Sequence, residues 1–141
     1  MREILFRGKR EDNNEWVYGF LSKSRGNNHF LSLCIDYEEN GVMLSSIVEP
    51  ETIGQYTGLS DKSGVKIFEW DIIKSHGNDS YVIKYGEYIP RNYCLARYYD
   101  KPTIGFYAYD GERCFQLSTD SRCYEVIGNI HDNPELAEGL L

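Results

Sequence analysis

Apolar and polar residues alternate along much of the chain with a period of two, which is typical of β-strands that bury one face. The clearest run contains Trp16, Tyr18 and Phe20, which fall on one face. The preceding run, Glu3 to Gly8, predicts a partner strand across the polar turn at residues 9–14. The N-terminal segment is therefore predicted to form a β-hairpin.

Short runs of the same kind continue to the end of the chain, separated by turn-forming pairs such as Asn40-Gly41 and Asp110-Gly111. The later predicted strands are residues 29–35, 42–48, 52–57, 65–75, 80–85, 93–99, 104–109, 113–117 and 123–130. A single short helical turn is predicted where Asn133, as N-cap, precedes Pro134 and Glu135. Short strands at this spacing favour a small barrel or roll.

Composition supports strands, because the 141 residues include three Ala against 12 Tyr, 6 Phe and 2 Trp. The apolar runs are far shorter than the roughly 20 residues that cross a bilayer, and the start, MREILFRGKR, lacks the apolar stretch of a signal peptide. We expect one soluble, cytoplasmic protein with no membrane partner.

The formal net charge of −7 disfavours a broad phosphate-binding surface, which would need many Lys and Arg. The charge is unevenly distributed, since residues 26–61 and 123–141 hold ten of the 22 acidic residues and no Lys or Arg. The rest of the chain carries a small positive excess. A local basic face is therefore compatible with the acidic total.

Residue types that perform catalysis or bind metals are scattered. The four cysteines, at 34, 94, 114 and 123, contain no C-x-x-C pair, and none of the three histidines is paired with a cysteine by position. Glu69 and Asp71 would share a face of a strand and could form a carboxylate pair, a weak signal that chance also produces. We expect no catalytic residue, no metal and no cofactor.

Residues 81–101 carry the most suggestive chemistry, because tyrosines interleave with Lys84, Arg91, Arg97 and Lys101. Aromatic rings stack on bases while nearby cations hold phosphates. The same residues also suit the wall of a barrel, with each ring inside and its hydroxyl outside, or a protein interface. All three interpretations stay open from the sequence.

Several blocks taken together resemble the YopX family of phage and prophage proteins. The blocks are Phe6-Arg7-Gly8-Lys9-Arg10, Trp16-Val17-Tyr18-Gly19, Glu51-Thr52-Ile53-Gly54-Gln55-Tyr56-Thr57-Gly58-Leu59, Asp61-Lys62-Ser63-Gly64, Ile67-Phe68-Glu69-Trp70-Asp71-Ile72-Ile73, Glu125-Val126-Ile127-Gly128-Asn129-Ile130 and Asn133-Pro134-Glu135-Leu136. The resemblance implies a phage or prophage origin, a compact β architecture with an SH3-like barrel or roll, and an uncharacterised function. It brings no catalytic residues.

The pattern of the family that this chain resembles usually has glycine between the residues that match Glu69 and Asp71, where this chain has Trp70. Tryptophan would be strained at a positive φ, so we expect ordinary β geometry there, with the indole facing outward or into a groove. The candidate binding residues are Trp70, Tyr85, Tyr93, Arg97, Tyr98 and Lys101.

The pattern and the resemblance together predict an all-β protein in three parts. These are a β-rich N-terminal part (1–54), an SH3-like β-barrel or roll (55–132) and a short C-terminal helical tail (133–141). The expected function is a non-catalytic binding protein in the host cytoplasm, acting on a protein partner or by self-association. The alternatives are a single-stranded nucleic-acid binding module using residues 81–101 and a small enzyme.

Overall fold

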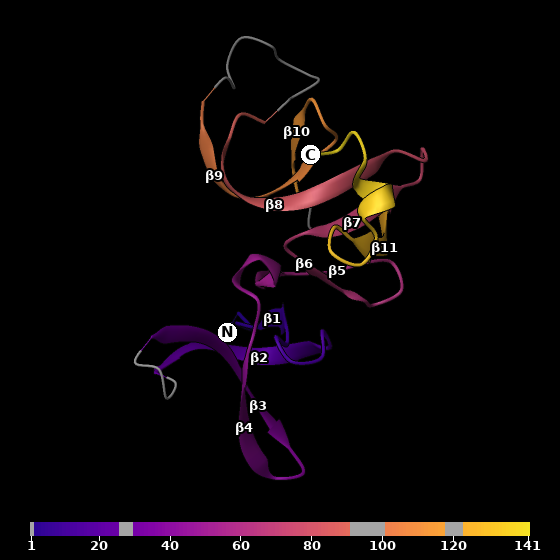
Figure 1. Ribbon diagram of the computed structural model, residues 1–141. Helices are drawn as coiled ribbons and strands as arrows, with labels where there is room; N and C mark the ends of the chain where they lie inside the picture. The colour runs from indigo at the N-terminus through magenta and orange to yellow at the C-terminus, as the bar shows by residue number, and fades with distance from the viewer. Residues whose placement is uncertain (1, 26–29, 91–100, 118–122) are drawn as a thin grey trace. The chain divides into compact units, whose positions relative to one another are not determined.

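The computed structural model describes residues 2–25, 30–90, 101–117 and 123–141, and strands dominate them (Figure 1). The strands are β1 (Phe6–Lys9), β2 (Trp16–Arg25), β3 (Leu31–Glu39), β4 (Val42–Ile47), β5 (Gly54–Ser60), β6 (Lys66–Phe68), β7 (Asp71–Ser75), β8 (Ser80–Tyr88), β9 (Thr103–Tyr109), β10 (Cys114–Gln116) and β11 (Tyr124–Asn129). Two short 3-10 helices, η1 (Pro50–Thr52) and η3 (Pro134–Ala137), complete the described elements. The predicted mainly β class is confirmed.

The chain divides into two compact units, residues 1–58 and 59–141. In the first unit the strands are antiparallel neighbours in the order β4-β3-β2-β1-β5. The predicted N-terminal hairpin is confirmed, with Phe6 paired to Gly19 and Lys9 to Trp16. Asn40 (φ 52°) and Gly41 (φ 78°) form the two-residue turn between β3 and β4, because both residue types tolerate the left-handed conformation that such a turn requires.

The buried apolar residues described in the first unit are few. They are Cys34, Ile35, Val48 and Tyr56. A Cβ on Gly19 would lie 2.0 Å from the carbonyl oxygen of Asp36, so only glycine permits this close approach of β2 to β3. The small core leaves most of the β2–β4 surface facing outward.

The second unit contains a five-stranded antiparallel sheet in the order β10-β9-β8-β7-β11. Its core lies on both faces, since the neighbours Ile72 and Ile73 are each fully buried in a different cluster. Ile73 packs with Ile67 and Ile83, whereas Ile72 packs with residues that include Ala137 of η3. The bulge between Val126 and Gly128 bends β11 at the edge of this sheet.

Asp61 connects the turn after β5 to β11 within the second unit. It is 5% exposed, and its Oδ1 accepts the N–H of Ser63 (2.8 Å) and of Val65 (2.9 Å). Its Oδ2 accepts the N–H of Val126 at 3.0 Å. Burial raises the pKa of Asp61, but the donors on Val126, Val65 and Ser63 outweigh it and hold the pKa below its usual value.

The run at residues 65–75, predicted as one strand, is two strands separated by a turn at Glu69 and Trp70. Trp70 has φ 72°, so the expectation of ordinary β geometry there is wrong. The turn is fixed by backbone bonds, since the Trp70 N–H donates to Ile83 O at 2.8 Å and its C=O accepts from Ile130 N at 3.1 Å. This chain therefore places a tryptophan in a conformation that favours glycine.

The predicted helical turn exists as η3, but its N-cap differs from the expectation. Asn133 precedes Pro134, yet its side chain makes no bond to the helix. Its Oδ1 accepts the Asn129 N–H at 3.2 Å instead. Asn133 therefore connects η3 back to the end of β11.

Candidate functional site

The most unusual surface of the described chain lies on β2, β3 and β4 of the first unit. Tyr18 and Phe20 on β2 are 47% and 63% exposed, and Met43 and Ile47 on β4 are 63% and 43% exposed. We call these four side chains the apolar face. Large apolar side chains gathered in this way are typical of interaction surfaces.

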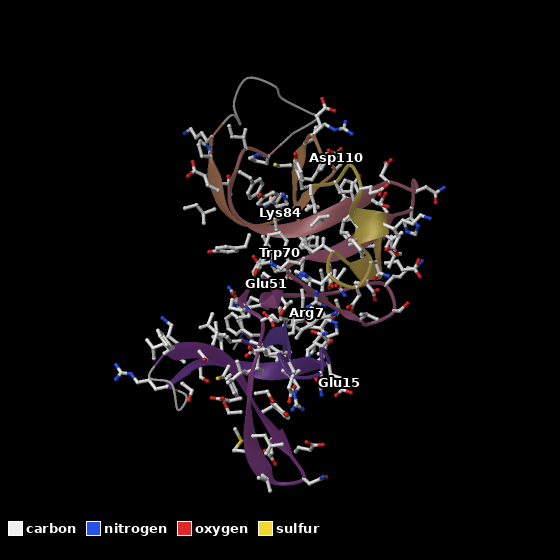
Figure 2. All side chains as sticks on the ribbon, viewed as in Figure 1. Arg7, Glu15, Glu51, Trp70, Lys84 and Asp110 are labelled. Carbon is white, nitrogen blue, oxygen red and sulfur yellow. The ribbon has the colours of Figure 1, made fainter. Side chains whose placement is uncertain are left out.

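The strand register puts these four residues on one side of the sheet. Phe20 pairs with Asp36, which pairs with Ser45, and directly paired residues point to the same face. Side chains alternate between faces along a strand, so Tyr18 lies on the same face as Phe20. For the same reason Met43 and Ile47 lie on the same face as Ser45. In Figure 1 the β3–β4 hairpin extends away from β1 and β2, and in Figure 2 its side chains stand out on both sides of the ribbon.

Beside the apolar face, β1 brings two cations onto Trp16. The Arg7 guanidinium carbon lies 4.7 Å from the centre of the Trp16 ring, and Lys9 Nζ lies 5.5 Å from it. Arg7 is buried, so this stacking serves the packing of β1 on β2. The predicted shared face of Trp16, Tyr18 and Phe20 is confirmed, and it runs from the half-buried Trp16 to the exposed Phe20.

Strand β4 is an edge strand that lacks charged residues and proline, and its outer side is covered only at the Ile47 end, by Glu11. It ends the sheet order, and its sequence, VMLSSI, has no charge and no proline. Natural edges are normally blunted by charges, proline or short length. Among the other described edge strands, β6 carries Lys66, β11 carries Glu125 and β10 is three residues long.

A cavity of about 520 Å³ lies at the Ile47 end of this edge. It is lined by Arg10, Glu11, Asp12, Ser45, Ser46 and Ile47. Arg10 and Asp12 neutralise each other through two contacts, Nε to Oδ1 at 3.0 Å and Nη2 to Oδ2 at 2.7 Å. The carboxylate of Glu11 therefore leaves the lining with a net negative charge.

The candidate residues from the sequence lie elsewhere, and only three belong to the described chain. Tyr85 is 54% exposed and its ring meets Phe106 edge to face at 4.9 Å. Lys101 is exposed, whereas Trp70 is half-buried and packs against the cluster around Ile72. Three further candidates, Tyr93, Arg97 and Tyr98, lie outside the described residues, as does the strand predicted at 93–99.

The described tyrosines of the β8–β9 ribbon contact other aromatic rings or a lysine. Tyr88 stacks on Tyr107 with ring centres 4.6 Å apart, and burial raises the pKa of both hydroxyls. Lys84 Nζ lies 4.4 Å above the ring of Tyr109 (Figure 2 marks Lys84). Tyr88 and Tyr107 therefore pack on each other, whereas Tyr85 stays exposed, and the role of this segment stays a prediction.

The acids singled out in the sequence do not form a carboxylate pair on one strand face. Glu69 lies in the turn, and Asp71 is 2% exposed, with its Oδ2 accepting the Phe68 N–H at 2.7 Å. In the part of the chain that the structure describes, no three His, Cys, Asp or Glu side chains are grouped to hold a metal ion. No helix in this part is long and apolar enough to span a membrane.

Sequence reasoning predicted the strand at residues 42–48 but did not select it as a site. The available signal was an uncharged strand following a segment rich in acids and free of Lys and Arg. That the strand stands at an edge depends on the order of the sheet, which the sequence did not give.

Comparison with known proteins gives one family. Residues 5–138 match the sequence model of the family described as YopX protein. No curated protein matches. Among solved structures, the crystal structure of protein EF1440 from Enterococcus faecalis is similar, with 24% sequence identity, a TM-score of 0.42, and coverage of 96% of this chain and 99% of that one.

Proposed function

The chain belongs to the YopX family, and we propose that it is a non-catalytic interaction protein that binds a protein partner through its first unit. The observation that carries this proposal is the apolar face, where Tyr18, Phe20, Met43 and Ile47 are exposed together. Aromatic residues and methionine are enriched in protein interfaces. A phage or prophage origin and action in the host cytoplasm are further parts of the proposal.

Self-association is the second form of the same proposal, because the apolar face of one copy can also cover that of another copy. The finer fold prediction, an SH3-like barrel over residues 55–132, stays a proposal as well. It is supported by the short antiparallel strands of the second unit.

The test places a photoreactive benzoyl-phenylalanine at residue 20 on the apolar face, or at residue 104 as the control. Ile104 is 71% exposed and belongs to the second unit, so it reports random encounters. After irradiation in the bacterium that carries the gene, mass spectrometry should identify one protein attached at position 20 and not at position 104. The substitution Met43→Ser should remove that adduct while leaving the fold intact.

Equal labelling at the two positions, or labelling that persists in Met43→Ser, would contradict a specific interface on the first unit. An adduct consisting only of this chain would favour self-association, and sedimentation of the purified protein would then show a dimer.

The alternative, binding of single-stranded nucleic acid through residues 81–101, is supported by the basic and aromatic composition of that segment. In a filter-binding titration, the fraction of a single-stranded oligonucleotide that the protein retains should then fall steeply as salt is added. Negligible retention at low salt would exclude it.

A further inference from the structure

We propose that the outer edge of β4 binds an extended peptide segment of a partner protein as an added antiparallel or parallel strand, and that this segment carries basic side chains. The inference rests on the proposed function and specifies how the partner is held. Four features support it: the direction of the β4 amides, the absence of charge and proline on the edge, the cavity at one end, and the charge of the surrounding residues.

The backbone groups of β4 alternate between β3 and the outside. The Val48 N–H donates to Leu33 O at 3.1 Å, toward β3, whereas Ile47 O accepts the Glu11 N–H at 3.0 Å, on the other side. In an antiparallel pair the direction reverses at each residue. The N–H and C=O of Met43 and Ser45 therefore point to the outer edge, where the described chain places no further strand.

The bond between Glu11 and Ile47 closes the edge at one end and limits the open part to residues 42–46. The cavity of about 520 Å³ lies at this end, beside Ser45 and Ile47. An added strand that runs along the open edge reaches the cavity with one of its side chains. Strand addition of this kind gains affinity from main-chain bonds and specificity from such pockets.

Charge selects the occupant. Within the first unit, residues 26–58 contain five acidic residues and no Lys or Arg. The cavity has a net negative charge because Glu11 is unmatched beside the Arg10–Asp12 pair. Asp36, which lies across from Ser45, has a buried Oδ1 with no hydrogen-bond partner among the described residues. A lysine or arginine on the incoming strand complements this field.

The same charges argue against a second copy as the occupant. Pairing β4 with β4 of another copy would bring two acidic segments together, each without a basic residue. Like charges in a strand interface are destabilising. The complementary partner is therefore a basic extended segment.

The decisive variant is Ser45→Pro. Because the Ser45 amide points outward, proline removes a donor of the open edge and no bond to β3, and edge strands tolerate proline at such positions. Ser45→Thr is the matched control, since it keeps the N–H. Far-UV circular dichroism, together with Trp16 fluorescence in a Trp70→Gly background, checks that both variants retain the fold of the first unit.

The experiment selects a displayed library of random nonapeptides on the full-length protein and on both variants. We expect enrichment of sequences with alternating β-branched residues and at least one Lys or Arg. Compared with the parent protein, Ser45→Thr should bind these peptides equally well, and folded Ser45→Pro should bind them at least tenfold more weakly. The enriched peptide should also bind more weakly as salt rises.

Several results would overturn the inference: no enrichment, enrichment of acidic peptides, or equal binding to folded Ser45→Pro. If Ser45→Pro loses its fold, Met43→Pro replaces it, because the Met43 amide also points outward, and equal binding to folded Met43→Pro and to Met43→Ser would overturn the inference as well. If the adduct at position 20 forms equally in Ser45→Pro, the partner uses the apolar face without strand addition. In that case the proposed function stands and this inference fails.

Discussion

Replacing Asp61 by asparagine tests whether one buried carboxylate holds the turn after β5 against β11. The change keeps the size of the side chain and removes its charge. Asparagine offers one acceptor oxygen, whereas Asp61 uses both oxygens for backbone N–H donors on Ser63, Val65 and Val126. In asparagine an amide NH₂ group takes the place of one of these two oxygens, and this NH₂ group would face a backbone N–H donor.

The magnitude follows from the bonds that are lost. A hydrogen bond to a charged group contributes about 1.5–3 kcal/mol, and a buried donor left without a partner costs a similar amount. Ser63 and Val65 lie at an exposed turn, where water can replace the carboxylate, so the Val126 bond between distant segments carries most of the effect. We expect Asp61→Asn to lower the free energy of unfolding of the second unit by about 2 kcal/mol.

The assay is unfolding in urea, monitored through tryptophan fluorescence. The chain has 2 Trp residues, and in a Trp16→Phe background only Trp70 remains, which reports the second unit alone. The control is Asp79→Asn, which changes an exposed acid of the same unit. Like most surface substitutions, it should change the free energy of unfolding by no more than about 0.5 kcal/mol. An Asp61→Asn midpoint equal to that of the control would refute the reasoning.

The pH dependence supplies a second check. The pKa of folded Asp61 lies below its ordinary value, so the ionised group stabilises the fold above the unfolded pKa, and this stability is lost as pH falls through the folded pKa. The difference between the parent and Asp61→Asn should therefore be largest near neutral pH and shrink in acid. A difference that stays constant down to strongly acidic pH would show that the charge is not responsible.

Three further changes test other parts of the structure. Trp70→Gly should be more stable than Trp70→Ala by about 1 kcal/mol in urea unfolding, because only alanine keeps the cost of a positive φ; equal stabilities would contradict that backbone conformation. Gly19→Ala should unfold the first unit, seen as loss of its circular dichroism signal, since its Cβ would lie 2.0 Å from the carbonyl oxygen of Asp36. In peptide mapping after brief treatment with a maleimide, Cys123 should be modified before Cys114, because Cys123 is exposed while burial raises the pKa of the Cys114 thiol; the reverse order would argue against this packing of β10.

Local chemistry explains which parts of the fold the sequence predicted. The hairpin turn at Asn40-Gly41 was predictable because both residues tolerate positive φ, which is a property of the residues themselves. The alternation of Trp16, Tyr18 and Phe20 likewise gave the correct face of β2. Both features depend only on neighbours along the chain.

The turn at Trp70 was missed for the opposite reason. Tryptophan resists a positive φ by itself, and its neighbours read as one continuous strand. The conformation is stabilised by distant partners, namely backbone bonds to Ile83 and Ile130 and the packing of the indole beside Ile72. Such tertiary contacts exceed a local cost of about 1–2 kcal/mol. The signal for this turn was the glycine that the family pattern has at position 70, and not a residue of this chain.

The edge position of β4 was missed because strand order is a property of the whole sheet. Its consequence appears in how the two units use their apolar residues. Of the described large apolar side chains that are exposed, ten of 16 belong to residues 1–58, whereas nine of the 13 buried hydrophobic residues belong to residues 59–141. The first unit therefore obtains little stability from its own core, and burial of each large apolar side chain by a partner would contribute about 1.5–3 kcal/mol. A surface of this kind stabilises a complex more than it stabilises the isolated unit, and for this reason the first unit is the part of the chain on which we place the partner.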